Sequence, residues 1–263
     1  MAEKANEKEI RKYLTSDAKD IIIETVEETG STNDEMKLRA EKGYKEVSLL
    51  IAESQTKGKG SKGRSFFSPD GSGCYMSFLL RPQYSAEKCT LLTTIAAVAA
   101  AEAIEAITNK KAQIKWVNDI YIERRKVAGI LTEAGFTNDG RKLSYAVVGI
   151  GINVYTPKGG FPSEIENIAS AIYDGESEIK NRLIAEIANR FIYYYKNLPE
   201  KEFISRYREK LFFLGEEITV TETDKTYTAV ATDIDDMCHL IVTLPDGKTR
   251  SLFSGEISIK PKL

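Results

Sequence analysis

Apolar and polar residues follow one pattern before Leu214 and another after it. In the first part, apolar runs of strand length alternate with stretches whose apolar residues recur at helical spacing. The runs predict strands at residues 21–26, 47–52, 74–80, 113–116, 119–123, 127–136 and 143–154. The other stretches predict helices at residues 3–17, 31–40, 91–107, 178–197 and 200–213.

The last two strands of the first part flank a turn at Thr137–Gly140, so we expect them to pair antiparallel. Beyond Leu214 the runs become short and alternating. They predict strands at residues 217–223, 227–234, 239–243 and 249–253. About fifty residues of this kind are typical of a small β-barrel. We therefore predict two domains, residues 1–213 and 214–263.

Composition indicates a globular protein. Of the 263 residues, 42% are hydrophobic, and the formal net charge of −2 creates no general attraction to nucleic acid or membrane. The longest apolar stretch, Leu91–Ala101, is shorter than the roughly 20 residues that span a membrane. The charged N-terminus lacks the apolar core of a signal sequence, so we expect a cytoplasmic protein.

Three cysteines and one histidine limit the available chemistry. Cys74, Cys89 and Cys238 are far apart and include no C-x-x-C pair, which argues against disulfides and against a zinc site. His239 is the single histidine, so a histidine-based triad would have to use it. We expect structural roles for all four residues.

The Gly-rich loop, Lys57–Arg64, has the sequence KGKGSKGR and is the first candidate for ligand binding. Its four cations and three glycines follow a predicted strand, a composition that suits a bound anion, although a solvated basic turn is the alternative. The spacing approaches that of a P-loop. A P-loop must open a helix, whereas Phe66–Gly71 is an aromatic pair followed by a turn, so a P-loop is rejected.

Four other segments carry polar groups. GSTN at 30–33 brings two hydroxyls and an amide to a helix start, where N-capping is the alternative explanation. KWVND at 115–119 combines a cation, a ring and a carboxylate able to hold Mg²⁺, although a turn beside a core Trp has the same composition. Lys126 precedes an apolar strand, and two interpretations of it stay open: a contact with a phosphate, or a solvated cap of the strand. VGIGINV at 148–154 has two glycines, which suit a flat ligand close to the backbone.

Taken in order, the segments GSTN, AESQTKGKGSKGR, KWVNDIYIERRKVAGILTE and GIGINV resemble the catalytic domain of biotin protein ligases. SGEIS near the C-terminus resembles the SH3-like barrel of that family. The resemblance implies an α+β fold with helices on a mixed or antiparallel sheet, related to class II aminoacyl-tRNA synthetases and lipoate ligases. It also implies that biotin and ATP, with Mg²⁺, form biotinyl-5′-adenylate, from which biotin passes to a lysine of a biotin carboxyl carrier protein.

The resemblance further implies a role for each residue that matches a motif. Biotin would be bound by Ser31, Thr32, Asn33, Gln55, Lys59, Gly60, Ser61, Lys126 and Gly129. ATP and the adenylate would be bound by Gly58, Lys62, Gly63, Arg64, Lys115, Trp116, Asn118 and Asn153. Lys126, Arg64 and Asp119 would be catalytic, and Asp119 would also hold Mg²⁺. Adenylation depends on positioning and charge neutralisation, so it needs no histidine.

The chain departs from the family pattern at three positions. The family loop is GRGR-x-GR, whereas Lys59 and Ser61 stand here in place of its first two arginines. Ser61 cannot make a bidentate contact with a phosphate, so our hypothesis is that the adenylate is held less tightly than in relatives. Val117 replaces the usual proline, which affects the stiffness of the turn more than the chemistry.

Two other functions are consistent with the motifs. A lipoate protein ligase would leave the hydrogen-bonding groups of Ser31, Thr32, Asn33 and Gln55 without partners, so biotin is favoured. A non-catalytic biotin or nucleotide sensor would not need Lys126 and Asp119. We expect no DNA binding, because only 23 residues precede Glu24. A homodimer formed through strand 146–152 as a sheet edge is a further expectation.

Overall fold

The structure is a computed structural model that describes residues 3–259 except 45–46, 83–87, 138–141, 174–176, 223–224 and 254. For Glu256 it describes the backbone alone. Most of the turn predicted at 137–140, and Ser254 of the SGEIS motif, lie outside the described residues.

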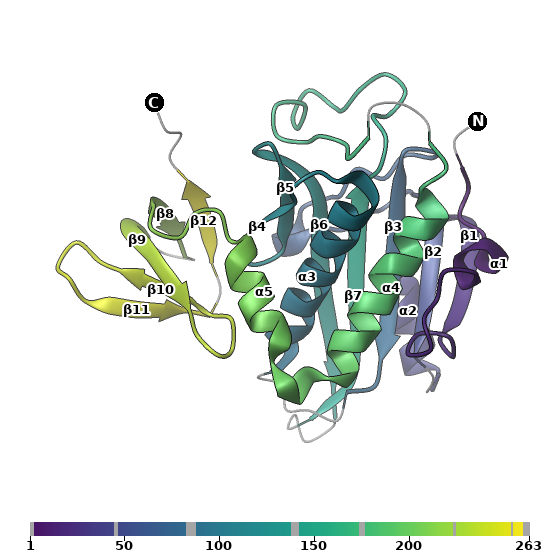
Figure 1. The fold of residues 1–263 in the computed structure, drawn as a ribbon, viewed down its shortest axis with the longest axis horizontal. Coiled ribbons are helices and arrows are strands. Elements are labelled where there is room, and N and C mark those ends of the chain that lie inside the picture. Colours follow the sequence, from purple (N-terminus) through teal and green to yellow (C-terminus); the bar gives the residue numbers. More distant parts are fainter. Residues whose placement is uncertain are drawn as a thin grey trace.

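A mixed sheet with the strand order β1-β2-β3-β7-β6-β5-β4 forms the central layer (Figure 1). The neighbours β1 and β2 are parallel and the other neighbouring pairs are antiparallel, β6 and β7 among them as predicted. The strands are β1 (Ile22–Thr29), β2 (Ser48–Gln55), β3 (Gly73–Leu80), β4 (Gln113–Lys115), β5 (Asp119–Ile122), β6 (Arg125–Phe136) and β7 (Leu143–Asn153). The predicted mixed sheet with helices is confirmed.

Helices cover the two faces of this sheet unequally (Figure 1). One face carries α3 (Cys89–Thr108), α4 (Lys180–Lys196) and α5 (Glu202–Lys210), whereas α2 (Thr32–Glu41) covers part of the other. Side chains of successive strand residues point to opposite faces, so the strands supply both cores. Met36 and Ala40 of α2 are buried against Leu50, Leu79 and Val147. The rest of this face of the sheet carries the polar motifs.

The helix α3 is long and apolar enough to cross a membrane by length and composition. Its side chains are largely buried, and Thr93 Oγ1 donates to Thr132 Oγ1 of β6 at 2.7 Å. A helix that is apolar nearly all round and enclosed on several sides is a core helix.

A second, antiparallel sheet follows, in the order β11-β10-β9-β8-β12. Its strands are β8 (Glu217–Thr221), β9 (Thr226–Ile234), β10 (Leu240–Thr243), β11 (Thr249–Leu252) and β12 (Glu256–Ile259). The first four match the predicted strands, and β12 was not predicted. This last strand is short and pairs with β8, so its partner is distant in sequence.

Two expectations were wrong. The strand at 146–152 is not an edge, because β7 lies between β3 and β6, and the sheet ends at β1 and β4. The N-terminal helix, α1 (Glu7–Arg11), is shorter than predicted. Tertiary hydrogen bonds hold the residues before it.

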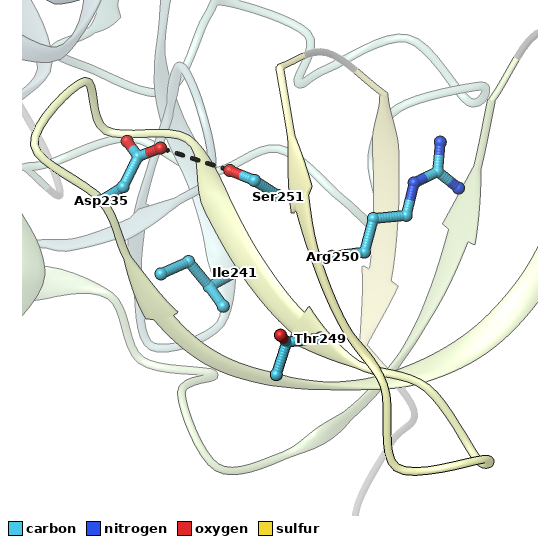
Figure 2. A pocket seen from close by; sticks show the side chains of 5 residues that line it. All are labelled: Asp235, Ile241, Thr249, Arg250 and Ser251. Carbon is cyan, nitrogen blue, oxygen red and sulfur yellow. Dashed lines mark hydrogen bonds between the residues drawn. The ribbon is translucent and has the colours of Figure 1, made fainter.

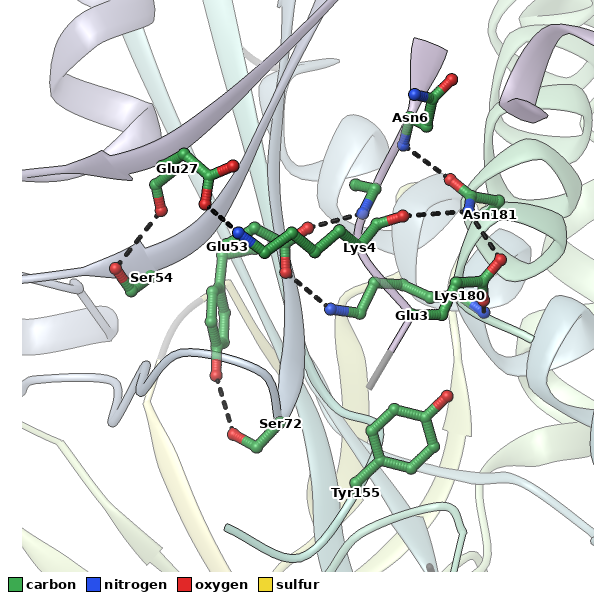
Figure 3. Close-up of polar contacts among 12 residues, drawn as sticks. Glu3, Lys4, Asn6, Glu27, Glu53, Ser54, Ser72, Tyr155, Lys180 and Asn181 are labelled. Carbon is green, nitrogen blue, oxygen red and sulfur yellow. Dashed lines mark hydrogen bonds and ion pairs between the residues drawn. The ribbon is translucent and has the colours of Figure 1, made fainter. Parts of the chain in front are cut away.

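The N-terminal segment is fastened to β2 and α4 by a polar network (Figure 3). Glu53 of β2 accepts from the Ala5 N–H at 2.5 Å and from Lys180 Nζ at 2.8 Å. Asn181 accepts from the Asn6 N–H at 2.8 Å. The Glu53 and Lys180 side chains are 5% and 1% exposed, so each charge needs the other as its partner.

Candidate functional site

Two polar motifs meet at the C-terminal ends of β1 and β2, because these two strands are parallel. The register pairs Thr29 with Gln55, so the two strands end side by side. GSTN follows β1 and the Gly-rich loop follows β2, and the Lys57 N–H donates to the Gly30 carbonyl at 2.8 Å. The topology therefore places the two motifs together, although more than twenty residues separate them in sequence.

Ser31 lies at the N-cap position of α2, but its side chain makes no capping hydrogen bond. N-capping therefore does not explain its hydroxyl. The next residue, Thr32, donates its backbone N–H to Gln55 Oε1 at 2.9 Å, and its hydroxyl donates to the same oxygen at 3.1 Å. Gln55 Nε2 donates in turn to Ser68 Oγ at 3.0 Å. Hydroxyl and amide groups are thus concentrated where the two motifs meet.

The Asn33 amide is occupied by groups of the protein itself. Nδ2 donates to Glu133 Oε2 at 2.8 Å and to the Leu131 carbonyl at 3.2 Å, and Oδ1 accepts from Ser77 Oγ at 2.6 Å. An amide nitrogen has two hydrogens, and both are used here. A Cβ at Gly149 would lie 2.2 Å from Asn33 Oδ1, so this glycine is needed for the contact. In this conformation Asn33 holds other groups in place.

Phe66 lies across two opposed glycines on the same face of the sheet. Gly129 and Gly151 are register partners, and a Cβ added to Gly151 would lie 2.6 Å from the Phe66 ring. A Cβ added to Gly129 would lie 3.4 Å from Lys126 Nζ. Gly151, one of the two glycines that we expected to admit a flat ligand, therefore admits the Phe66 ring.

Lys126 and Asp119 form an ion pair over this face. Lys126 Nζ lies 2.6 Å from Asp119 Oδ1, and the side chains are 29% and 25% exposed. The Lys126 backbone is fixed by the segment after β7, because its N–H donates to Ile168 O and its carbonyl accepts from Ser170 N, both at 2.8 Å. Asn153, the last residue of β7, donates to the Ser170 carbonyl at 3.0 Å.

A chain of charges joins the Gly-rich loop to α2. Asp34 Oδ1 lies 2.6 Å from Lys59 Nζ and 2.9 Å from Lys37 Nζ, and Lys37 Nζ lies 2.7 Å from Glu133 Oε1. Partial burial raises the pKa of Asp34, but the hydrogen bonds from Lys59 and Lys37 outweigh it, and the pKa lies below its usual value. The charge of Lys59 is thus balanced by Asp34.

The Gly-rich loop folds back on itself through a 3₁₀ turn, η1 (Ser61–Gly63). The Gly60 N–H donates to the Arg64 carbonyl at 2.7 Å, and Arg64 Nη2 lies 3.4 Å from Ser61 Oγ. Lys62 has φ +58°, in the left-handed region. A Cβ at Gly58 would lie 2.4 Å from the Phe66 carbonyl, so glycine is required there. The next described element is β3, in agreement with the rejection of a P-loop.

The KWVND segment joins β4, which ends at Lys115, to β5. Asn118 Nδ2 donates to the Ile130 carbonyl at 2.7 Å. Trp116 is only 5% exposed, and its Nε1 donates to the Cys238 carbonyl of the second sheet at 3.0 Å. The contact of Trp116 with ATP stays a prediction, and in this structure its ring lies in the core.

Mg²⁺ is usually held by one or two carboxylates together with water and substrate phosphates. Among the described residues, no group of three or more His, Cys, Asp and Glu side chains is arranged so that it could hold a metal ion. Asp119 would be the single protein carboxylate that binds such an ion. One of its oxygens already faces Lys126.

Sequence reasoning missed Phe66, Ser77 and Glu133. Ser77 is 0% exposed and Glu133 contacts both Asn33 and Lys37. Both lie within strands whose alternation indicates only which face they occupy. Their partners on α2 are more than 40 residues away in sequence, so no local signal identifies them.

Two of the three cysteines are buried, and the structural roles expected for the cysteines and the histidine stay predictions. Cys74 and Cys238 are buried, Cys89 is partly buried, and all three are free. Burial raises the pKa of the Cys74 and Cys238 thiols to about 12, which suppresses the reactive thiolate. His239 Nδ1 lies 2.9 Å from Asp235 Oδ2, on the second sheet.

Two hollows open on the second sheet. The smaller, about 250 Å³, is lined by Asp235, Ile241, Thr249, Arg250 and Ser251 (Figure 2). The larger, about 590 Å³, is lined by Lys225, Tyr227, Thr228, Leu244, Pro245, Asp246 and Arg250. None of these residues belongs to the polar motifs, so the candidate site rests on the face formed by β2, β6 and β7.

Comparison with known families gives two matches. Residues 25–153 match the biotin/lipoate A/B protein ligase family, and residues 213–260 match the biotin protein ligase C terminal domain.

Individual relatives agree with these matches. The chain is 31% identical over 219 residues to the bifunctional ligase/repressor BirA of Bacillus subtilis, covering 81% of this chain and 66% of that protein, just under two thirds of its length. It is 26% identical over 247 residues to the biotin–[acetyl-CoA-carboxylase] ligase of Mycobacterium tuberculosis, covering 89% and 88%. The structure of the biotin protein ligase from Aquifex aeolicus in complex with biotin and ATP is similar, with a TM-score of 0.76, 27% identity and coverage of 92% and 99%.

Proposed function

Because the chain belongs to the biotin protein ligase family, we propose that it activates biotin with ATP and transfers it to a lysine of a biotin carboxyl carrier domain. One observation carries the proposal. The Lys126–Asp119 pair, the cationic Gly-rich loop and the hydroxyl and amide groups around Ser31 and Gln55 all lie around one face of the sheet.

In the first step, a carboxylate oxygen of biotin attacks the α-phosphorus of ATP, and pyrophosphate leaves. Two anions must approach each other, so fixed cations are the main requirement. Lys126 supplies one at the sheet, and Lys59, Lys62 and Arg64 supply others from the loop. Bound Mg²⁺ would neutralise phosphate charge, with Asp119 as its protein ligand.

In the second step, the neutral amine of the carrier lysine attacks the biotinyl carbonyl and an amide bond forms. The C–O bond to the phosphate breaks, AMP leaves, and the nitrogen gives up one proton to solvent. Lys126, which helps to bring the anions together in the first step, is then placed to neutralise the departing phosphate.

Recognition of the biotin ring would rely on Ser31 and Gln55. The Ser31 hydroxyl is not used for capping, and the Gln55 amide gives one of its two hydrogens to Ser68. Asn33 and Thr32, whose side chains bond to the protein, would hold this surface in shape. Gly60 keeps its proposed role at biotin, and Gly63, Lys115, Asn118 and Asn153 keep theirs at the nucleotide.

Further features belong to the same proposal. We propose that residues 1–213 form a catalytic unit of the class II synthetase type and that residues 214–263 form an SH3-like unit. We also propose a cytoplasmic location. Homodimerisation and the absence of DNA binding stay predictions.

The test is a transfer assay with ATP, Mg²⁺, labelled biotin or lipoate, and a carrier domain that lacks the modification. We expect label transfer from biotin, no transfer from lipoate, and loss of transfer in Lys126→Ala. Lys111→Ala, which removes an exposed lysine outside the site, serves as the matched control. Transfer from lipoate alone would establish the rival ligase, and ligand binding without transfer would establish a sensor.

A further inference from the structure

The loop between β9 and β10, residues 235–239, lies against the KWVND segment of the larger sheet. Its Cys238 carbonyl accepts the hydrogen bond from Trp116 Nε1 at 3.0 Å. The side chains of Cys238 and Trp116 are 0% and 5% exposed. A buried N–H that loses its acceptor costs more than an exposed one, so this single carbonyl matters for the position of the ring.

The KWVND segment makes a further hydrogen bond with a residue outside it. The hydroxyl of Tyr207, a 0% exposed residue of α5, donates to the Val117 carbonyl at 2.9 Å. The helix α5 is itself tied to the second sheet, because Arg208 Nε lies 2.6 Å from Asp233 Oδ1 and Arg208 Nη2 donates to the Ile234 carbonyl at 3.1 Å. One support of the Trp116–Val117 dipeptide therefore comes from the second sheet, and the other comes from a helix that contacts this sheet.

Asp235 fixes the shape of the 235–239 loop. Its Oδ1 accepts from the N–H groups of Met237 and His239 at 2.8 and 2.9 Å, and its Oδ2 lies 2.9 Å from His239 Nδ1. Ser251 Oγ donates to the same Oδ2 at 3.2 Å (Figure 2). The three groups do not form a nucleophilic triad, because Ser251 bonds to Asp235 and not to the histidine. The Asp235 carboxylate instead fixes the conformation of the loop.

The loop needs this support because of its backbone. Cys238 has φ +59°, in the left-handed region that a cysteine rarely occupies. Its N–H donates to the Asp235 carbonyl at 2.9 Å, and the Asp235 N–H donates to the His239 carbonyl at 3.0 Å. Without the Asp235 side chain, the turn loses three further hydrogen bonds within the loop, and the orientation of the Cys238 carbonyl is no longer fixed.

We infer that Asp235 is a positioning residue for the adenylation step, which it influences through the Cys238 carbonyl, Trp116 and the Asn118–Asp119 pair that follows. The second sheet then sets the geometry of the nucleotide side of the site. The biotin side, built by β2 and α2, does not depend on this loop. This consequence for catalysis rests on the proposed function, whereas the control of Trp116 by Asp235 does not.

Fluorescence tests the positioning by itself, because Trp116 is the single tryptophan of the chain. In Asp235→Ala we expect the Trp116 emission to shift to longer wavelength and its quenching by acrylamide to rise at least about twofold, as the indole loses its acceptor and gains exposure to water. Asp246→Ala is the matched control, since Asp246 accepts from the Lys248 N–H at 3.1 Å in another turn of the same sheet. Unchanged emission and quenching in Asp235→Ala would overturn the inference.

Kinetics tests the consequence. We expect the KM for ATP of pyrophosphate release to rise roughly threefold to tenfold in Asp235→Ala, the effect of about one buried hydrogen bond, with the KM for biotin unchanged. Asp235→Asn keeps an oxygen that accepts the two N–H groups and should restore most of the wild-type value. An equal rise in the KM values for ATP and biotin would contradict the inference, because a general loosening of the structure would affect both substrates alike.

Two further results remain distinguishable. If Asp235→Ala does not fold, Asp235→Glu carries the same test, because it keeps the charge but moves the carboxylate away from the N–H groups of Met237 and His239, and it should change Trp116 emission in the same direction. If wild type transfers no biotin, the proposed function fails, while the fluorescence comparison still decides whether Asp235 positions Trp116.

Discussion

Lys126 Nζ and Asp119 Oδ1 lie 2.6 Å apart on neighbouring strands, above the backbone of Gly129. The glycine leaves room for the lysine side chain against the sheet. The carboxylate therefore fixes where the ammonium group points before any substrate anion arrives, which is the form of preorganisation that charge stabilisation requires.

Removal of the Asp119 charge should impair the enzyme without unfolding it. In Asp119→Asn we expect kcat for pyrophosphate release to fall at least about tenfold, because Lys126 loses its orienting partner and the metal loses its ligand. The pair is partly exposed, so the free energy of unfolding should change by less than about 1 kcal/mol. Rapid-quench kinetics and urea unfolding measure the two effects. Wild-type kcat in this variant would remove Asp119 from the site.

Asp34 should keep the Gly-rich loop closed in the free protein. The loop has four cationic residues, so trypsin cuts it readily once it opens. In Asp34→Asn we expect cleavage to become about twofold to fivefold faster, the range for a partly exposed ion pair. Glu35→Gln is the matched control, since Glu35 pairs with Arg39 within α2. Equal cleavage rates in the two variants would show that Asp34 does not hold the loop.

Ser61 should weaken the hold on the adenylate. Its hydroxyl lies near Arg64 and cannot make the two parallel contacts that an arginine offers a phosphate. We expect Ser61→Arg to slow adenylate dissociation, by about tenfold for a gain of about 1.4 kcal/mol. Release of labelled biotinyl-adenylate after dilution gives the rate, with Ser65→Arg, directly after the loop, as a control. If Ser61→Arg does not slow release, the hypothesis fails.

Gly151 should tolerate no side chain while Phe66 is present. A Cβ there would lie 2.6 Å from the ring, so Gly151→Ala must displace Phe66 or the strand. We expect a loss of about 1–3 kcal/mol in the free energy of unfolding, the usual cost of overpacking. The double variant Gly151→Ala/Phe66→Ala should lose less than the sum of the two single variants. Gly30→Ala is the control, since an added methyl group there meets nothing within 4 Å.

Acid should loosen the 235–239 loop. Partial burial raises the pKa of Asp235, but hydrogen bonds from the His239 and Met237 N–H groups and from the His239 ring outweigh it, and the pKa lies below its usual value. A lowered carboxyl pKa contributes stability that is present above the unfolded value, about 3.9, and is lost as the pH falls through the folded value. We expect Trp116 emission to change below about pH 4, and less steeply in Asp235→Asn. An equally steep change in that variant would assign the transition to other carboxyls.

Periodicity was enough to predict the long inner strands of the larger sheet, such as β3 and β7, because each is a dense apolar run. Their order was not predictable, and the expected edge strand at 146–152 lies in the middle of the sheet. Pairing depends on contacts between distant segments, such as β3 with β7, for which the local sequence has no signal.

The candidate site was predictable as a set of motifs but not as a geometry. The two motifs after β1 and β2 were both identified, whereas their proximity follows from the parallel pairing. The glycines at 149 and 151 were interpreted as space for a ligand, and the structure shows Asn33 and Phe66 against them. The ring of Trp116 was assigned to the nucleotide, while its hydrogen bond joins it to a residue 122 positions later.

The parallel pairing of β1 and β2 has a consequence for protein engineering. Both strands end at the candidate site, so Lys42 and Gly43, which follow α2, lie toward the opposite ends of the strands. Exposed connections far from a binding face accept added sequence best. A peptide tag or fluorescent label inserted after Gly43 should therefore leave ligand contacts intact, whereas the same insertion at Gly30 would separate the two motifs.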